Sequence, residues 1–252
     1  MNMVVFGAGG WVGRAVLQNM AGRHQIRAVL RGPESWDKYK EVDGEWRGGE
    51  IIYGNIEDFN FTHKMTEGMD GIIHLTVYFP GKDENDEKPF SINLKGLWNV
   101  LECARRRGIK RVVHVGSCQT VHPKGIFFSS EVRRPDGALY AICKRLQEEM
   151  CRQFHEAHGQ RIIVLRPDYI VDSRLGIGWA KEKLGTEGHK TRTGWVCRHD
   201  FAEACRLALE QDQTAFDILH IVGTPEAEKT CNVARSKEVL GLVYKGNLEK
   251  YR

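Results

Sequence analysis

The sequence predicts an α/β fold in which one parallel sheet is covered by helices on both faces. Short apolar runs alternate with longer segments whose apolar residues recur at helical spacing. These runs contain few polar residues, which is typical of strands buried on both sides. A glycine-rich turn joins the first strand to the first helix. The three observations predict a Rossmann-type, doubly wound parallel sheet over residues 1–168, with a small C-terminal region over 169–252 in the same domain.

The elements follow from these patterns in chain order. Strands are expected at 3–6, 26–30, 51–53, 71–75, 112–115, 162–165 and 218–222. Helices are expected at 12–20, 92–107, 139–158 and 201–210. The charged stretch 81–88 is expected to be a solvated loop. The irregular segment 172–194 holds five glycines and several cations between a strand and a helix, so it is expected to cover the end of the sheet as a lid.

Composition narrows the classes of function and location. Lys and Arg number 37 against 33 for Asp and Glu, and a net charge of +4 gives no reason to expect nucleic acid as a partner. No apolar run is long enough to span a bilayer, and the strand expected from Met3 leaves no room for a signal peptide. Seven cysteines without CxxC spacing predict free thiols, a cytoplasmic location and no structural zinc. The ten histidines show no metal-binding spacing, so no metal is expected.

The glycine turn carries the strongest chemical signal. Gly7 allows a tight turn out of the strand, Gly10 removes a side chain where a pyrophosphate would approach, and Gly13 allows close packing of helix on sheet. The free N–H groups at the helix start, where Trp11 and Val12 lie, favour negative phosphates. Since this loop follows a strand and opens a helix, it predicts a dinucleotide site.

The choice between NAD and NADP depends on the end of the second strand. An NAD site usually has an acidic side chain there to hold the ribose 2′-hydroxyl, but this strand ends in Arg31. The cation favours the 2′-phosphate of NADP, and Arg14 is a second candidate contact. The alternatives are NAD as the cofactor and Arg31 as a surface charge that points away from it.

Tyr140 and Lys144 are four residues apart on an expected helix and therefore share a face. A nearby ammonium group favours phenolate and lowers a tyrosine pKa. The pair therefore predicts Tyr140 as an acid or base toward a substrate hydroxyl. Lys144 is also expected to bond the nicotinamide ribose.

Taken in order, these motifs resemble the extended short-chain dehydrogenase/reductase superfamily, in particular its NAD-dependent epimerase/dehydratase family. The resemblance covers nearly the whole chain. It includes the glycine loop and the segments 70–75, 93–102, 111–117, 140–144, 165–167, 198–200 and 235–241, the last being the family's C-terminal helix. The segments 134–137 and 193–195 are similar to the uronate dehydrogenases within that family.

The resemblance implies further site residues. Tyr140 becomes the catalytic acid/base, Lys144 its pKa partner and Asn93 part of the supporting polar network. Asn55, Ile56, Leu75 and Pro167 become cofactor contacts.

Three departures from the family pattern stand out. Alignment on Thr120 puts Cys118 at the position of the catalytic Ser or Thr, with Ser117 one place earlier. A thiol is a poorer donor than a hydroxyl, so either Ser117 substitutes for it or polarisation of the substrate is weakened. Asn55 replaces the family's Asp near the adenine, and the acid after the second strand is missing.

The substrate is expected to be small and anionic. About 22 residues, from Asp172 to Thr193, separate the sixth strand from the next family element, which is little chain to enclose a nucleotide sugar. Arg174 and Arg192 belong to a cationic cluster in this segment that would complement a sugar acid. Trp195 either stacks on a sugar face or anchors the loop to the core.

The leading hypothesis is an NAD(P)-dependent oxidoreductase that moves a hydride between nicotinamide and a small polar substrate, a sugar or sugar acid. One alternative is a sugar epimerase or dehydratase that holds NAD(P) tightly. Another is a regulatory protein that senses NADP without turnover, a reading motivated by Cys118 and Arg31 and opposed by Tyr140 and Lys144. The apolar positions of the two long helices permit a homodimer, and no membrane partner is expected.

Overall fold

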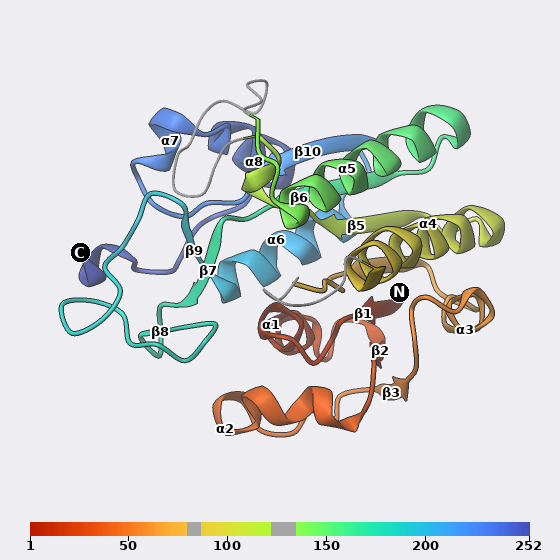
Figure 1. Cartoon of the computed structure of the whole chain (residues 1–252), viewed down its shortest axis with the longest axis horizontal. Coiled ribbons are helices and arrows are strands. Elements are labelled where there is room, and N and C mark those ends of the chain that lie inside the picture. Colours follow the sequence, from red (N-terminus) through yellow and green to blue (C-terminus); the bar gives the residue numbers. More distant parts are fainter. Residues whose placement is uncertain (80–86, 122–134) are drawn as a thin grey trace.

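The computed structural model of the chain describes residues 1–79, 87–121 and 135–252 (Figure 1). Most of the expected loop at 81–88 and part of the segment 134–137 lie outside the described residues. The strands of the main sheet are β1 (Asn2–Phe6), β2 (Gln25–Leu30), β3 (Glu50–Tyr53), β4 (Gly71–His74), β5 (Arg111–Val115), β6 (Ile162–Arg166) and β10 (Phe216–His220). The longer helices are α1 (Trp11–Met20), α3 (Phe59–Met65), α4 (Gly96–Arg107), α5 (Leu139–His158), α6 (Arg198–Glu210) and α8 (Val233–Leu240).

The seven strands form one parallel sheet in the order β10-β6-β5-β4-β1-β2-β3. The chain moves outward from β1 in one direction through β2 and β3, then crosses to β4 on the other side. Such a reversal leaves a crevice at the carboxyl ends of β1 and β4, which is where open α/β sheets bind ligands. The predicted Rossmann-type, doubly wound sheet is confirmed.

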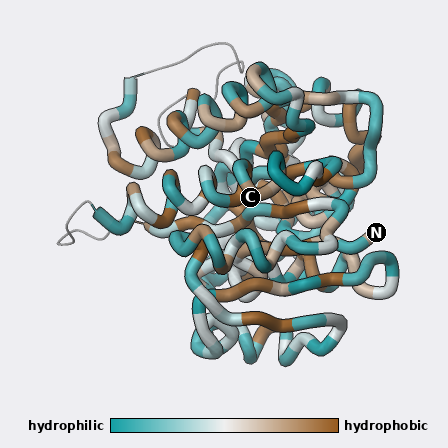
Figure 2. The backbone as a smooth tube through the Cα atoms, turned by 90° about the vertical axis from the view of Figure 1, so that its right-hand side faces the viewer, coloured by the Kyte–Doolittle hydropathy of each residue, from teal (hydrophilic) through white to brown (hydrophobic). Residues whose placement is uncertain are grey.

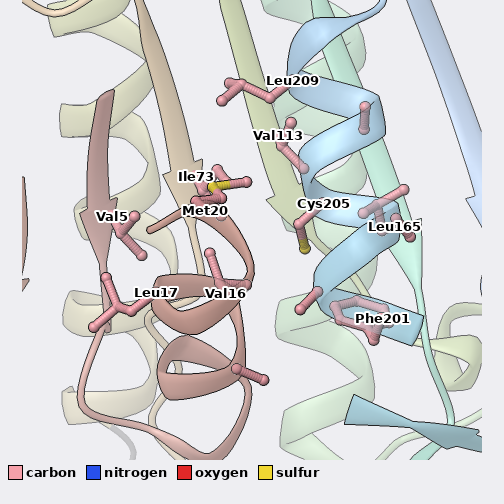
Figure 3. Packing of buried hydrophobic residues seen from close by; sticks show 14 of the residues in the cluster. Val5, Val16, Leu17, Met20, Ile73, Val113, Leu165, Phe201, Cys205 and Leu209 are labelled. Carbon is pink, nitrogen blue, oxygen red and sulfur yellow. The ribbon is translucent and has the colours of Figure 1, made fainter. Parts of the chain in front are cut away.

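Helices cover both faces of the sheet. On one face α1 and α6 lie side by side, and the close-up in Figure 3 shows Leu17 of α1 and Phe201 of α6 in one cluster with strand residues such as Val5 and Leu165. On the other face α3, α4 and α5 enclose a second core. Successive residues of a strand point alternately into the two cores, as Val5 and Val4 of β1 do, which accounts for the nearly continuous apolar strands. Figure 2 shows these hydrophobic segments running through the middle of the molecule.

The expected helix at 92–107 is divided in the structure. Residues Pro89–Lys95 form a π-helical turn, η2, and α4 follows from Gly96. The Gln147 amide of α5 donates to the backbone carbonyl of Asn93 at 2.6 Å. That bond draws the Asn93 carbonyl into a contact with a neighbouring helix, so the tertiary contact and the wider turn occur together.

A second, smaller sheet lies in the C-terminal region. It joins β8 (Ile177–Gly178), β7 (Tyr169–Asp172) and β9 (Trp195–Cys197) in that order. The segment expected to be irregular therefore contains strand structure, because β7 and β9 pair across a long connection that no local pattern reveals. The remaining short elements are the helical turns η1 (Pro33–Tyr39), η3 (Cys118–Thr120) and η4 (Glu249–Tyr251), with α2 (Lys40–Asp43) and α7 (Ala227–Thr230).

All seven cysteines are unpaired and buried, as the predicted free thiols require. In the part of the chain that the structure describes, no helix is long and apolar enough to cross a membrane. Within the same residues, no group of three or more His, Cys, Asp or Glu side chains is arranged to hold a metal ion.

Candidate active site

The glycine loop has the geometry that its spacing predicts. Gly7 has a φ of +83°, and a Cβ there would lie 2.9 Å from the Thr76 backbone nitrogen. A Cβ on Gly13 would lie 2.5 Å from the carbonyl oxygens of Gly7 and Ala8. Gly10, by contrast, is exposed, and its Cβ would meet only the Gly7 oxygen, at 3.4 Å. Gly7 and Gly13 thus permit the fold, whereas Gly10 keeps the approach to the loop open.

The start of α1 is suited to an anion. Its N-cap residue is Gly10, no side chain caps the helix, and the first turn carries no acidic residue. The backbone N–H groups of the first turn and the helix dipole therefore face an open approach without a competing carboxylate. These observations fit the pyrophosphate of a dinucleotide.

Two predicted cofactor contacts near the loop have structural partners instead. The Arg14 guanidinium is buried and donates to the carbonyl oxygens of Gly44, at 2.8 Å, and Trp36. The expectation that Arg14 reaches a cofactor phosphate is therefore wrong, because these bonds hold it inside the fold. The Trp11 indole Nε1 donates to the Ile170 carbonyl at 3.0 Å, so only its backbone N–H remains a candidate contact.

Arg31 is exposed just past the carboxyl end of β2 and has no side-chain partner among the described residues. Asn55 is also exposed, although its Oδ1 accepts from the Glu57 backbone N–H at 3.0 Å. The Ile56 side chain is buried beneath Gly96, so its side chain faces the core. Among the described residues, the expected adenosine end thus has an unpaired cation, Arg31, and an accessible amide, Asn55.

Tyr140 lies in the first turn of α5, next to Ser117 at the end of β5. Burial raises the pKa of Tyr140 to about 12; a hydrogen bond with the Ser117 side chain opposes this rise, and nearby Asp168 adds to it. Tyr140 therefore stays protonated at neutral pH in this arrangement. The Ser117 side chain thus lies near enough to the phenol to affect its pKa, and the two hydroxyl groups together can orient and protonate a substrate oxygen.

The structure separates the roles of Ser117 and Cys118. The Cys118 side chain is fully buried, and its thiol donates to the Arg166 carbonyl at 3.3 Å. Its neighbours are apolar residues beyond the end of the sheet, including Val222 and Val233. Burial raises the pKa of the Cys118 thiol well above its usual value. Ser117, not Cys118, therefore meets Tyr140, which corrects the expected placement of Cys118 at the catalytic position.

Lys144 lies one turn after Tyr140 on the same face of α5, as the spacing predicts. Its Nζ donates to the Val115 carbonyl at 2.8 Å and lies 5.9 Å from the centre of the Tyr140 ring. Burial lowers the pKa of Lys144 to about 8, while the carboxylate of Glu148 opposes that fall. The expected lowering of the Tyr140 pKa by Lys144 is not found, because burial of the phenol outweighs an ammonium group that points at the end of β5.

Asn93 fixes the backbone beside the site. Its side chain accepts from the Tyr78 N–H at 2.7 Å and donates to the Tyr78 carbonyl at 2.9 Å. Both ends of the amide are therefore used by the backbone of one residue, Tyr78, in the segment after β4. The structure gives Asn93 a positioning contact beside the tyrosine, and a role in proton transfer stays a prediction.

Three further predicted cofactor contacts lie near the carboxyl ends of the strands; two are half-buried and one is buried. Val12 and Leu75 are half-buried and pack against the core that α1 covers. Pro167 is buried, and its carbonyl accepts from the Cys118 N–H at 2.8 Å. These placements border the carboxyl ends of β1, β4 and β6.

The predicted substrate residues differ in exposure. Trp195 is 1% exposed and packs with Val171 and Leu184, so the structure supports its anchoring role and not the stacking role. Arg174 and Arg192 are exposed. The expected cationic cluster is partly neutralised, since Lys181 lies 3.3 Å from a Glu41 carboxylate oxygen.

Sequence reasoning missed several residues at this site. The Phe79 ring stacks on Tyr140 with 5.1 Å between ring centres, and Trp179 stacks on Phe79 at 6.3 Å. Asp168 acts on Tyr140 through its charge. Gly9 is a further glycine that the fold requires, because a Cβ there would lie 2.7 Å from the Ser35 carbonyl oxygen. Only Gly9 had a local signal, the Gly-Gly pair in the loop.

Comparison with known proteins identifies a family. The model of the NAD dependent epimerase/dehydratase family matches residues 3–171, which includes the glycine loop, Ser117, Tyr140 and Lys144. Uronate dehydrogenase of Agrobacterium fabrum is 29% identical over 171 residues, covering 65% of this chain and 59% of that protein. The chain therefore spans about three fifths of the length of this curated relative.

Two solved structures illustrate the shared fold. The uronate dehydrogenase of Agrobacterium tumefaciens superposes with a TM-score of 0.74 at 22% identity, covering 98% of this chain and 85% of that one. The UDP-glucuronic acid 4-epimerase of Bacillus cereus, in complex with NAD, has a TM-score of 0.78 at 16% identity and covers 100% and 96%. At these identities the likeness shows the fold.

Proposed function

Because this chain belongs to the NAD-dependent epimerase/dehydratase family, we propose that it is an NAD(P)-dependent oxidoreductase acting on a small polar substrate, a sugar acid. The observation that carries the proposal is the contact between Ser117 and Tyr140, one turn from buried Lys144 and at the same edge of the sheet as the open glycine loop. A structural helix has no need to bury this combination of polar groups at the same edge of the sheet as an exposed glycine loop.

Cofactor binding, substrate orientation and proton transfer are proposed for different residues of the chain. The backbone N–H groups at the start of α1 would hold the pyrophosphate beside Gly10, and Lys144 would hold the nicotinamide ribose. When bound, the nicotinamide ring supplies a site that accepts or donates a hydride. Ser117 orients the substrate oxygen, and the Tyr140 hydroxyl gives that oxygen a proton in the reductive direction or takes one in the oxidative direction.

The protonation state of Tyr140 at neutral pH favours proton donation over proton abstraction. Since burial raises its pKa to about 12, the phenol carries its proton at neutral pH and is ready to donate it. The oxidative direction needs a phenolate, and burial of the phenol disfavours that charged form. Reduction of a carbonyl is therefore the easier direction near pH 7.

We further propose NADP over NAD as the preferred cofactor. The support is the unpaired guanidinium of Arg31 beyond β2, in the absence of a carboxylate at the tip of that strand in the described chain. The sugar-acid class draws on the names of the related uronate dehydrogenase and UDP-glucuronic acid 4-epimerase. Exposed Arg174 and Arg192 would attract such an anion.

Absorbance at 340 nm tests the proposal. The purified chain is incubated with NADP⁺ or NAD⁺ and D-glucuronate or D-galacturonate, and the reverse reaction is followed with NADPH and the corresponding lactones. We expect a net absorbance change that scales with enzyme concentration. Interconversion of sugars without net absorbance change would instead indicate an epimerase. Tight cofactor binding without either reaction, across a panel of sugars and aldehydes, would indicate a sensor.

A further inference from the structure

Two exposed aromatic side chains lie beside Tyr140. Phe79 is 60% exposed and Trp179 is 42% exposed, although both are large and apolar. They come from the segment after β4 and the turn after β8, 100 positions apart in the chain. The fold nevertheless brings their rings together, with an angle of 15° between the two ring planes.

The three rings form a nearly parallel series. The Phe79 ring is tilted by 20° from the Tyr140 ring, at 5.1 Å between centres, and Trp179 lies beyond Phe79 at 6.3 Å. We call Phe79 and Trp179 together the aromatic wall. The wall thus begins at the side chain that we propose as the acid/base, and it extends toward the lid segment.

Neighbouring side chains fix the positions of both Phe79 and Trp179. The Asn93 amide bonds both the N–H and the carbonyl of Tyr78, which fixes the backbone immediately before Phe79. The Tyr39 hydroxyl donates to the Trp179 carbonyl at 2.8 Å, and the Lys38 ammonium lies 4.7 Å from the centre of the Trp179 ring. A preorganised surface loses little side-chain entropy when a ligand covers it.

The exposure of these two aromatic side chains beside Tyr140 suggests a surface that binds a ligand. Leaving two large rings in water forgoes the free energy of burying them, and a patch of this kind usually marks a binding surface. The face of an aromatic ring is weakly negative, so it attracts the C–H groups on one side of a sugar ring. An open-chain substrate offers no such continuous face.

We propose that the aromatic wall binds the apolar face of a cyclic, pyranose-form substrate and makes the enzyme selective for cyclic over open-chain substrates. This inference rests on the proposed function for its choice of sugar acids. Phe79 and Trp179 are specificity-determining residues in this account, and they take no part in proton or hydride transfer. Their loss should therefore weaken binding of the ring without slowing the chemical step.

The first experiment compares steady-state kinetics of Phe79→Leu and Trp179→Ala with the parent chain. The probes are D-glucuronate as the cyclic substrate and DL-glycerate as a small open-chain hydroxy acid. We expect KM for D-glucuronate to rise about fivefold to tenfold in each variant, with kcat within about twofold and with no comparable change for glycerate. Trp98→Ala is the matched control, since Trp98 is 43% exposed on α4 and contacts Phe59 instead of the site.

A second measurement keeps the inference separate from the proposed activity. Saturation-transfer NMR with D-glucuronate should show enhanced transfer to its ring C–H protons in Tyr140→Phe, where turnover is suppressed, and this signal should fall in Tyr140→Phe combined with Trp179→Ala. An unchanged KM and an unchanged NMR signal in the wall variants would overturn the inference. So would an equal loss for glycerate and glucuronate. Ring binding that depends on Trp179 without any hydride transfer would support the wall while refuting the oxidoreductase.

Discussion

Ser117 and Cys118 show how much the chemistry depends on the direction of one side chain. The two residues are neighbours at the end of β5, but the serine contacts Tyr140 and the thiol donates to the Arg166 carbonyl in an apolar pocket. A hydroxyl is the stronger donor, so the better of the two groups faces the site. If the proposed function holds, we therefore expect cysteine at the family's usual serine position to leave catalysis intact.

We predict that Ser117→Ala lowers kcat by about 10- to 100-fold, because it removes the group that orients the substrate oxygen. Cys118→Ala should leave kcat within about twofold and lower the free energy of unfolding by about 1 kcal/mol, because it only empties part of a packed site. Both variants are assayed by NADPH absorbance and chemical denaturation. A large loss of kcat in Cys118→Ala with little effect of Ser117→Ala would reverse these assignments.

At the residue scale, local spacing predicted Gly7, Gly10, Gly13, Tyr140 and Lys144 because each role is set by neighbours a few positions away. The direction of the Tyr140 pKa shift could not be predicted this way. It depends on how deeply the phenol is buried and on where the Lys144 ammonium points, and both are decided by the packing of α5 against β5.

At the scale of elements, a buried ionic cluster joins the smaller sheet, β8-β7-β9, to helices that cover the main sheet. Arg198 at the start of α6 donates to both carboxylate oxygens of Asp43 and to Asp172 at the end of β7, all at 2.7 Å. The three side chains are at most 3% exposed. The cluster connects α2, β7 and α6, and so fixes the segment that carries Trp179 relative to the glycine loop.

We predict that Arg198→Ala lowers the free energy of unfolding by about 3–5 kcal/mol, because it leaves two buried carboxylates without their partner. Burial alone would raise the pKa of Asp172, but bonds from His199, the Leu175 N–H and Arg198 hold it well below its usual value. The stabilisation is thus present above about pH 4, the pKa of an unfolded Asp, and is lost as the pH falls further. The penalty of the substitution should therefore shrink in acid.

Urea denaturation followed by tryptophan fluorescence at pH 7 and pH 3 measures both effects. Arg47→Ala is the control, since Arg47 is an exposed residue paired with Glu45, and it should change stability by less than about 0.5 kcal/mol. Equal effects of the two substitutions would contradict a structural role for the cluster.

Periodicity predicted most elements of the main sheet because its strands are short apolar runs and its helices have one apolar face. It predicted α5 at its observed bounds. It could not predict β7, β8 and β9, since β8 has two residues and β9 pairs with β7 across some twenty residues of connection. Periodicity also could not predict the π-helical turn, because that turn occurs together with a tertiary bond from Gln147 on another helix.

For the whole molecule, the sheet order places the glycine loop, Tyr140 and the aromatic wall at one edge. Phe79 and Trp179 lie 100 positions apart in the chain, so no local segment of the sequence reveals the wall. The outer faces of α4 and α5 carry exposed Trp98, Ile142 and Leu146, which keeps the expected homodimer as a prediction. The substrate is the least predictable feature, because its contacts come from loops whose positions are set by the entire fold.

The central claim is that the glycine loop and Tyr140 belong to one working active site. The most direct test measures cofactor affinity and turnover of Tyr140→Phe side by side with the parent chain. We predict that the variant binds NADPH with a Kd within about threefold of the parent, while kcat falls by about 100-fold or more because the proton donor is gone. Turnover that survives in Tyr140→Phe, or a parent chain that binds neither NADPH nor NADH, would contradict the account.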